Sequence, residues 1–402
     1  MSQIINTNVL SLNAQRNLGN SQGALAQSLE RLSSGLRINS AKDDAAGLAI
    51  SERFSTQIRG LNQAVRNSND GISFAQTAEG ALGTVGDALQ RARELAVQAA
   101  NDSNSASDRQ ALNDEVQQLM SEVSRIANST EFNGGRVLDG SVQDLFFQVG
   151  ANQGQTIAVS GVDSRTSELG TTEAMSGTRF SQEQIEAGLE FSGLFVIELL
   201  DDGVFAGDSM TTTFAGVTSL EGLARDINRA IQDAAAGNST IADAGLSAAL
   251  RVDNAGNTGV VINGAFGAEF DVSDGIAVTD SDGDPVGGPV FGAQLATQVN
   301  LIDIDVITRE SATQAIGALD GALTQVNSLR AELGAVQVRF ESTIDNLGVS
   351  FENLSDARSR IRDADFATET AELTRAQVLQ QAGTSVLSQA NAVPQNVLAL
   401  LQ

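Results

Sequence analysis

The chain has 402 residues, of which 24 are Lys or Arg and 50 are Asp or Glu, so its formal net charge is −26. It contains no His, Cys, Trp or Tyr. The lack of His and Cys excludes Ser-His-Asp triads, thiolate nucleophiles, disulfides and the usual zinc sites. The acidity argues against nucleic acid, because phosphates would be repelled. We therefore expect no enzyme, no cofactor, no metal site and no nucleic-acid partner.

The first third of the sequence is predicted to be helical. Apolar residues recur at alternating spacings of three and four, for example at Leu25, Leu29, Leu32 and Leu36, which is typical of a helix with one narrow seam. A polar segment at 101–105 separates two such patterns. So short a turn predicts two antiparallel helices.

The last third carries the longest pattern, with a heptad seam between residues 316 and 361 that is interrupted by Arg330, Gln337 and Arg358. A strict repeat of 3.5 residues implies a left-handed supercoil, which needs partner helices from the first third or from other chains. We therefore pair the two ends of the chain. The predicted seam residues are Leu319, Leu323, Val326, Leu333, Phe340, Ile344, Leu347, Phe351 and Leu354.

The middle of the chain changes period. Turn signals at 133–135 and 139–140 and strand-like runs at 145–149 and 156–159 predict a small β-hairpin element. Residues 181–300 hold 18 acidic and only three basic residues, with short strand-like runs around one helical stretch at 219–235. This composition predicts a separate α+β insert. We expect deletion of about 178–300 to leave assembly competence.

These patterns predict a mainly α protein with a smaller α+β part. Its framework is a long antiparallel coiled-coil bundle formed by both chain ends. The predicted divisions are terminal helices at 1–42 plus 360–402, a coiled-coil core with the β-hairpin at 43–177 plus 301–359, and a surface-exposed insert at 178–300.

The chain ends have the character of assembly segments. Ordering 41 residues costs roughly 40–80 kcal/mol of backbone entropy. Burying the four leucines of the first helix returns about 2 kcal/mol each. Such a helix either packs on its own chain or orders when other copies supply neighbours. The pattern alone leaves both arrangements open.

Several motifs resemble bacterial flagellin, and the resemblance covers about 280 of the 402 residues at both ends and in order. They are the segments 5–9 (INTNV), 29–39 (LERLSSGLRIN), 42–50 (KDDAAGLAI), 69–73 (NDGIS), 93–98 (RELAVQ), 147–151 (FQVGA) and 393–398 (VPQNVL).

The resemblance implies a structural protein that polymerises with copies of itself into the flagellar filament. Its terminal helices would line an inner tube and its insert would lie outside. It also implies an extracellular location, reached through the flagellar type III pathway without a cleaved signal peptide. The implied partners are an export chaperone, the filament cap protein and the hook–filament junction protein. No apolar run in the sequence is long enough for a membrane span.

Two sets of site residues follow from the resemblance. Leu89, Gln90, Arg91, Leu95 and Glu115 match positions through which many flagellins meet Toll-like receptor 5. The alternative is a polar face hidden between filament subunits. Val397, Leu398, Leu400 and Leu401 resemble C-terminal apolar residues contacted by inflammasome sensors and by the export chaperone, and the alternative is that they only line the core tube.

Two other functions remain open from the sequence. A hook–filament junction protein of the same family shares the terminal helices and would be present at few copies per cell. A non-flagellar signalling or adhesion coiled coil would be an ordered monomer or dimer with protease-resistant ends.

Overall fold

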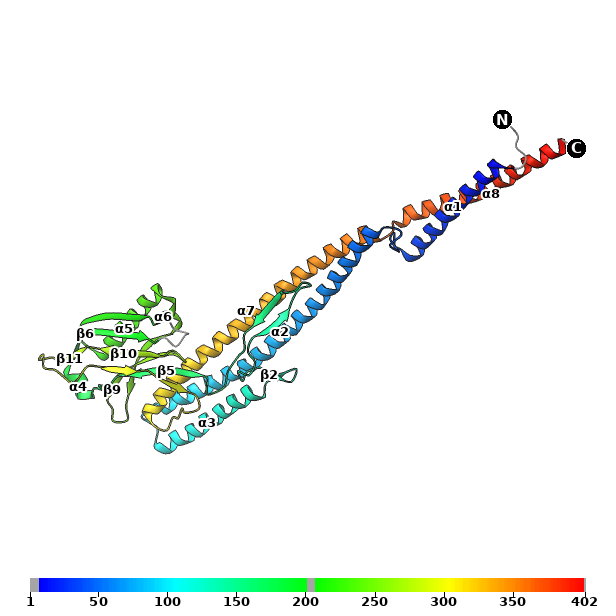
Figure 1. Cartoon of the computed structure of the whole chain (residues 1–402). Coiled ribbons are helices and arrows are strands. Elements are labelled where there is room, and N and C mark those ends of the chain that lie inside the picture. The colour runs from blue at the N-terminus through cyan, green and yellow to red at the C-terminus, as the bar shows by residue number, and fades with distance from the viewer. Residues whose placement is uncertain (1–6, 201–206, 401–402) are drawn as a thin grey trace. The chain divides into compact units, whose positions relative to one another are not determined.

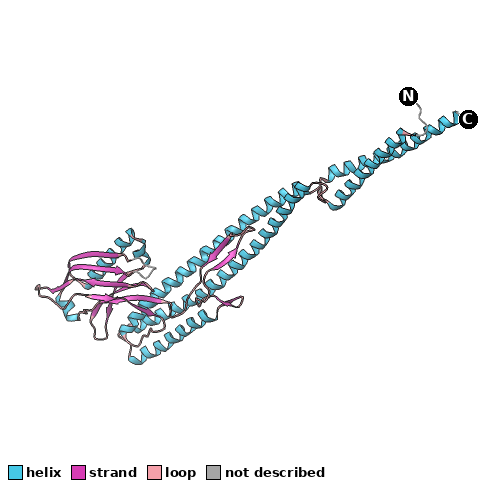
Figure 2. Cartoon of the chain, viewed as in Figure 1, coloured by secondary structure: helices cyan, strands magenta, loops and turns pink. Residues whose placement is uncertain are grey.

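The structure, a computed structural model, describes residues 7–200 and 207–400. Figure 1 shows the chain coloured by residue number and Figure 2 by secondary structure. The helices are α1 (Val9–Ser34), α2 (Ala45–Ala99), α3 (Ala106–Ser129), α4 (Gln182–Ala187), α5 (Leu220–Gly237), α6 (Ser239–Asp243), α7 (Arg309–Arg362) and α8 (Phe366–Leu400). The strands are β1 (Glu131–Phe132), β2 (Gly135–Arg136), β3 (Leu145–Gln148), β4 (Thr156–Val159), β5 (Gly170–Met175), β6 (Leu189–Leu199), β7 (Ser209–Val217), β8 (Ser247–Val252), β9 (Thr258–Ala265), β10 (Phe270–Asp274), β11 (Ala277–Asp280), β12 (Ala293–Leu295) and β13 (Thr297–Asn300).

The chain divides into two compact units. The first comprises residues 1–68, 148–156 and 341–402, and the second comprises 69–147 and 157–340. The long helices α2 and α7 contribute residues to both. Each unit is therefore built from segments that are distant in sequence.

In the first unit the two ends of the chain lie side by side, as α1 and α8 (Figure 1). Asn8 caps the N-terminus of α1 with its side-chain oxygen, and its Nδ2 donates to the Ala390 carbonyl at 2.8 Å. Ser11 Oγ donates to Asn391 Oδ1 at 2.8 Å. The predicted pairing of the chain ends is confirmed.

In the second unit α2 and α3 form the antiparallel pair predicted from the polar turn. Ser105 begins α3 with a capping box, in which its side chain accepts from the Asp108 N–H and the Asp108 side chain accepts from the Ser105 N–H. The predicted turn at 133–135 joins β1 to β2. There Asn133 and Gly134 have φ values of 51° and 78°, in the left-handed region that short hairpin turns require.

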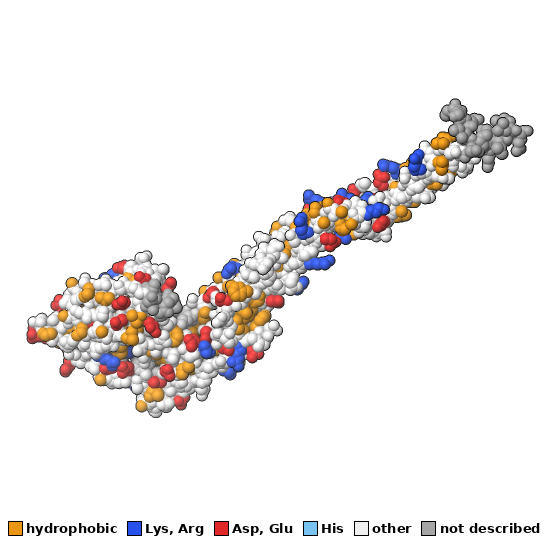
Figure 3. All heavy atoms as spheres, in the orientation of Figure 1, with side chains coloured by type: hydrophobic (Ala, Val, Ile, Leu, Met, Phe, Trp, Pro, Cys, Tyr) orange, Lys and Arg blue, Asp and Glu red, His pale blue; other side chains and the backbone are white. Residues whose placement is uncertain are grey.

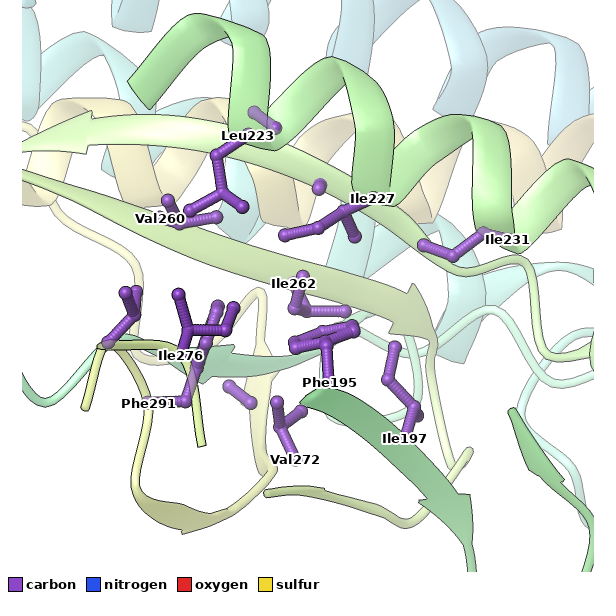
Figure 4. Packing of buried hydrophobic residues seen from close by; sticks show 14 of the residues in the cluster. Phe195, Ile197, Leu223, Ile227, Ile231, Val260, Ile262, Val272, Ile276 and Phe291 are labelled. Carbon is purple, nitrogen blue, oxygen red and sulfur yellow. The ribbon is translucent and has the colours of Figure 1, made fainter. Parts of the chain in front are cut away.

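The insert contains two antiparallel sheets around one core. One sheet has the order β13-β5-β9-β8, and the other has the order β11-β6-β10-β12 with β7 on the opposite edge of β6. Figure 4 shows side chains of α5, β9, β6 and β10 pointing toward one another, among them Ile227, Val260, Phe195 and Val272. The helical stretch expected at 219–235 is α5, capped by Ser219.

The strand β5 lies between two layers. Its first five residues are all buried, although the sequence Gly-Thr-Thr-Glu-Ala-Met has no apolar run. Ala174 belongs to the insert core, whereas the Glu173 side chain receives a hydrogen bond from Gln314 of α7. Because both faces of β5 are covered, this strand fixes the insert sheet to the helix.

The predicted fold class is confirmed: long helices from both chain ends pack together, and the central insert is α+β. The placement of β5 was not predicted. Within the described ranges, none of the helices combines the length and apolarity that crossing a membrane requires.

Candidate functional site

The α1–α8 pair exposes large apolar side chains. Those that are 49–70% exposed are Val9, Leu10, Leu12 and Leu29 on α1 and Phe366, Val378, Leu379 and Val386 on α8. The buried residues of α1 are only Ser11, Ala14 and Ser28. Figure 3 shows hydrophobic side chains at the surface of the helices. A helix pair that buries so little leaves its apolar surface for further neighbours.

The two segments that connect the terminal helices to α2 and α7 are bonded to each other. The Arg37 N–H donates to the Arg362 carbonyl at 2.7 Å, and the Ala364 N–H donates to the Gly35 carbonyl at 3.0 Å. Arg31 and Glu369 form an ion pair at 3.1 Å.

In each connecting segment one aspartate side chain accepts hydrogen bonds from the neighbouring backbone. Asp43 accepts from the backbone N–H groups of Asn39 and Ser40, and the hydrogen bond from Ser40 is the main cause that lowers its pKa. Asp365 accepts from the Thr368 hydroxyl and from the N–H groups of Ala367 and Thr368, which lowers its pKa in the same way. These hydrogen bonds favour the ionised form of both carboxylates.

The predicted seam residues differ in burial along α7. Leu319, Val326, Leu333, Phe340 and Leu347 are buried, Leu323, Ile344 and Leu354 are partly buried, and Phe351 is 38% exposed. In the second unit the Phe340 and Phe147 rings pack edge to face, with their centroids 5.5 Å apart. In the first unit Leu347 packs with Leu61 and Ala64 of α2.

Two of the polar interruptions of the seam share one partner. Gln337 Nε2 donates to Glu79 Oε2 at 3.0 Å, and Arg330 lies 3.9 Å from the other oxygen of the same carboxylate. Glu79 is on α2, so the polar positions pair across the two helices. Such pairs fix the register of a seam.

The five residues expected to meet a receptor divide into two groups. Gln90, Arg91 and Glu115 are exposed, whereas Leu89 and Leu95 are buried. Arg91 bonds to Glu115 on α3 at 3.0 Å and to Glu94 at 3.0 Å, and these bonds raise its pKa. The exposed surface thus presents an Arg fork held between two carboxylates, and the two leucines hold α2 in place beneath it.

The expected C-terminal contacts lie at the end of the chain. Val397, Leu398 and Leu400 are within α8, and Leu401 lies outside the described residues. Their roles stay predictions.

One face of α7 that the heptad pattern did not predict contacts the insert. Glu310, Gln314, Gly317, Gly321 and Gln325 recur at spacings of three and four, and we call them the insert-facing stripe. Gln314 Nε2 donates to Glu173 Oε1 at 2.6 Å, and Gln325 Oε1 accepts from the Gly170 N–H at 3.2 Å. The glycine pair spaced by four was the available sequence signal.

The contact between the insert-facing stripe and β5 depends on the close approach of two backbones and on a buried ion pair. A Cβ on Gly321 would lie 2.3 Å from the Gly170 carbonyl oxygen, so only glycine lets β5 come this near. Glu173 is also paired with Arg251 Nη1 at 2.9 Å, and both side chains are about 95% buried, with 6% and 5% exposed. Arg179 links Glu310 to Asp253 at the turn between β8 and β9.

Comparison with known proteins places these helical ends in one family. Residues 5–143 match the bacterial flagellin N-terminal helical region, and residues 316–401 match the bacterial flagellin C-terminal helical region. The chain belongs to the bacterial flagellin family.

Similarity to flagellins extends over the whole chain. It is 37% identical to flagellin of Salmonella typhimurium over 501 aligned residues and 42% identical to flagellin A of Vibrio anguillarum over 410, with 100% of each chain covered. The structure of FliC from Burkholderia pseudomallei matches 67% of this chain and 99% of that chain at 26% identity, with a TM-score of 0.37. A flagellin of this kind is a structural protein.

Proposed function

We propose that this flagellin polymerises with copies of itself into the extracellular filament of a bacterial flagellum, for swimming. The observation that carries the proposal is the exposed apolar surface on both α1 and α8, in a chain whose two ends match the flagellin family. Because these eight side chains are 49–70% exposed, burying the rest of each against other copies contributes about 1–2 kcal/mol. That gain supplies a driving force for assembly that the single chain lacks.

The three predicted divisions give this assembly its layout. The terminal helices at 1–42 and 360–402 form the inner core. The coiled-coil core at 43–177 and 301–359 surrounds it, and the insert at 178–300 faces outward. The low net charge of the first 41 residues, with three Arg and one Glu, supports close packing of many copies at the centre.

A substitution at an exposed apolar position tests the proposal. Leu12 is 57% exposed in the single chain, so Leu12→Asp leaves the monomer folded and prevents filaments because it puts a carboxylate into the inner core. Leu12→Met is the matched control and retains filaments. Electron microscopy after seeding, with circular dichroism of the monomer, reads out both properties. Filaments of normal length from Leu12→Asp would overturn the proposed inner core.

Limited proteolysis tests whether the ends order on assembly. Roughly the first and last 40 residues are expected to be trimmed in the monomer and protected after seeding with filament fragments. Ends that resist protease equally in both states would instead support an intramolecular bundle, the arrangement expected of a non-flagellar coiled coil.

Export through the flagellar type III pathway, without cleavage of a signal peptide, fits a chain that must leave the cell before it polymerises. We assign cover by the export chaperone to the C-terminal apolar residues Val397, Leu398, Leu400 and Leu401. The filament cap and hook–filament junction proteins are the partners at the two ends of the polymer. Pull-down of the chaperone with the full chain, against a chain ending at residue 392, tests the first assignment.

Recognition of the free monomer by Toll-like receptor 5 is a second role. The exposed Gln90, Arg91 and Glu115 would contact the receptor, and the buried Leu89 and Leu95 would support them. A guanidinium with an exposed fork and a neighbouring carboxylate offers both signs of charge to a protein partner.

The same-family alternative is a hook–filament junction protein. The relatives described above are flagellins and match the entire chain, which favours the filament subunit. Counting copies of this chain per isolated flagellum separates the two, because a junction protein is present in few copies and a filament subunit forms nearly all of the mass.

A further inference from the structure

The strand β7 is an open edge of its sheet. It pairs with β6 alone, and just beyond the pairing the Leu199 N–H donates to the Asp208 carbonyl at 2.8 Å. Antiparallel ladders alternate, so the N–H and C=O groups of Ser209, Thr211 and Thr213 point away from β6. Across residues 7–200 and 207–400, no hydrogen bond from another element reaches these groups. They form a row of unused donors and acceptors.

A groove runs beside this open edge. It has a volume of about 520 Å³ and is formed by β7 and α5. Ala230 and Ala234 of α5, both partly buried, line it with small side chains. An edge strand beside a helix is the arrangement in which extended peptides are bound by strand addition.

The charge along the groove favours a cation. On the helix side Arg229 also lines the groove and pairs with Asp226 at 3.1 Å, and Arg225 lies 3.8 Å from the same carboxylate. Asp233 is exposed and has no ion-pair partner among the described residues, so it is the unbalanced charge of the groove. Residues 209–217 are uncharged, while residues 181–300 hold 18 acidic and three basic residues. A second copy of the chain would bring the same negative charge, so a cationic occupant is favoured over self-pairing.

We propose that the groove between β7 and α5 binds an extended cationic peptide segment of a partner protein, which joins the sheet as a strand beside β7. Main-chain bonds to Ser209, Thr211 and Thr213 supply affinity. Alternate side chains of the peptide face the two alanines, and a Lys or Arg reaches Asp233. This surface lies outside the helices on which the proposed filament role depends, so each can fail without the other.

A designed peptide probes the groove in the full chain. The probe is acetyl-Lys-Thr-Val-Thr-Val-Thr-Lys-amide, which places Lys and Val on one face and reads alike in either direction. Binding is followed by fluorescence anisotropy with a labelled probe and by hydrogen exchange at the amides of Ser209, Thr211 and Thr213. We expect saturable binding and slower exchange of these amides. The matched control peptide carries Glu in place of both Lys and is expected to bind at least about tenfold more weakly.

Two protein variants test the mode of binding. Thr211→Pro removes a main-chain donor that points away from β6, so the ladder stays intact while affinity falls about tenfold. Thr211→Ala keeps the donor and is the matched control, with unchanged affinity. Asp233→Lys is expected to lower the affinity for the peptide with Lys and to raise the affinity for the peptide with Glu.

Three outcomes would overturn the proposal. Equal affinity of Thr211→Pro and Thr211→Ala, in variants that keep the wild-type circular dichroism, would exclude strand addition. Equal binding of the Lys and Glu peptides would exclude the cationic occupant. Self-association of the full chain that Thr211→Pro abolishes, without peptide binding, would identify a second copy as the occupant. Filament formation, measured in parallel, is expected to be unchanged by Thr211→Pro.

Discussion

Arg91 joins α2 to α3 through its ion pair with Glu115, and the receptor contact proposed for it can be tested separately from that pair. Its bonds to Glu94 and Glu115 are solvent-exposed, and exposed pairs contribute little to stability. We therefore expect Arg91→Ala to leave the thermal unfolding of the monomer nearly unchanged and to reduce the receptor response by about tenfold or more. A reporter-cell assay with purified monomer measures this response.

The exchanged pair Arg91→Glu with Glu115→Arg is the control. It keeps an ion pair between α2 and α3 but reverses the charges shown to a receptor, so we expect no recovery of the response. Full recovery would mean that Arg91 acts only by joining the helices.

Asp43 and Asp365 make the connecting segments sensitive to acid. Their hydrogen bonds lower both pKa values, so the stabilisation is complete above the ordinary carboxyl pKa of about 4. It is lost as the pH falls below that value and through the lowered pKa values. We expect cleavage of seeded filaments by pepsin near residues 35–44 and 362–366, where the ordered ends are protected, to increase steeply between about pH 4 and pH 2. In the double variant Asp43→Asn with Asp365→Asn, cleavage at these segments should depend less on pH. An identical pH profile in the variant would contradict the assignment.

At the scale of helices, contact between α2 and α7 depends on a glycine. A Cβ on Gly71 would lie 2.5 Å from Phe340 Cζ. Alanine in a helix interior normally stabilises by about 1 kcal/mol, but overpacking costs about 1–3 kcal/mol. We therefore expect Gly71→Ala to destabilise the monomer in urea unfolding.

Gly80 of the same helix is the matched control, because no atom lies within 4 Å of the position of its Cβ. Gly80→Ala should stabilise by about 0.5–1 kcal/mol. Adding Phe340→Leu to Gly71→Ala should recover part of the loss, since the smaller side chain makes room. Stabilisation by Gly71→Ala alone would show that the ring moves aside at no cost.

The sequence predicted the elements that depend on a single periodicity. The seam of α7, the antiparallel turn at 101–105 and the helix at 219–235 each carry a repeated apolar pattern or a turn signal, and each lies where expected. The strand β5 carries no such signal, because its burial comes from a charged pair and a glycine contact. Glu173 in a strand normally indicates a solvated face. Only the three-dimensional positions of Arg251 and Gln314 explain why it is buried.

For the candidate receptor residues, too, the sequence did not show which side chains are buried. Resemblance indicated five positions, but it could not distinguish those that are exposed from those that are buried beneath them. The seven-residue repeat through Leu82, Leu89 and Ala96 could have identified Leu89 as core. Leu95 lies one position before Ala96, outside that repeat, so the pattern did not indicate its burial.

At the scale of the whole molecule, the structure indicates where the insert can be removed. The Leu301 N–H donates to the carbonyls of Leu169 and Thr166 at 3.0 Å, so the two ends of the insert sheet meet there. We expect a chain lacking residues 170–300, joined by a short Gly-Ser linker, to retain its helical content and form filaments. Circular dichroism and electron microscopy check both properties.

Removing only residues 178–300 should destabilise the remaining chain more than removing residues 170–300. That deletion keeps β5 but removes β9 and β13, the two strands that pair with it, so the backbone groups of β5 and its apolar Ala174 lose their cover. It also removes Arg251, so Glu173 keeps only Gln314 of α7 as a partner, and Glu173→Gln in the same deletion should recover part of the loss. Filaments from the shorter deletion but not from the longer one would show that β5 itself is needed for assembly.

The insert-facing stripe also has a mechanical consequence. Drag from the surrounding fluid on a rotating filament would act on its outermost parts. Here the insert is held by contacts at Glu310, Gln314, Gly321 and Gln325 along α7 as well as by its two covalent connections. Load on the insert would therefore enter α7 as shear distributed over about four helical turns. A chain tethered only through its loops would instead concentrate the same force at two flexible points.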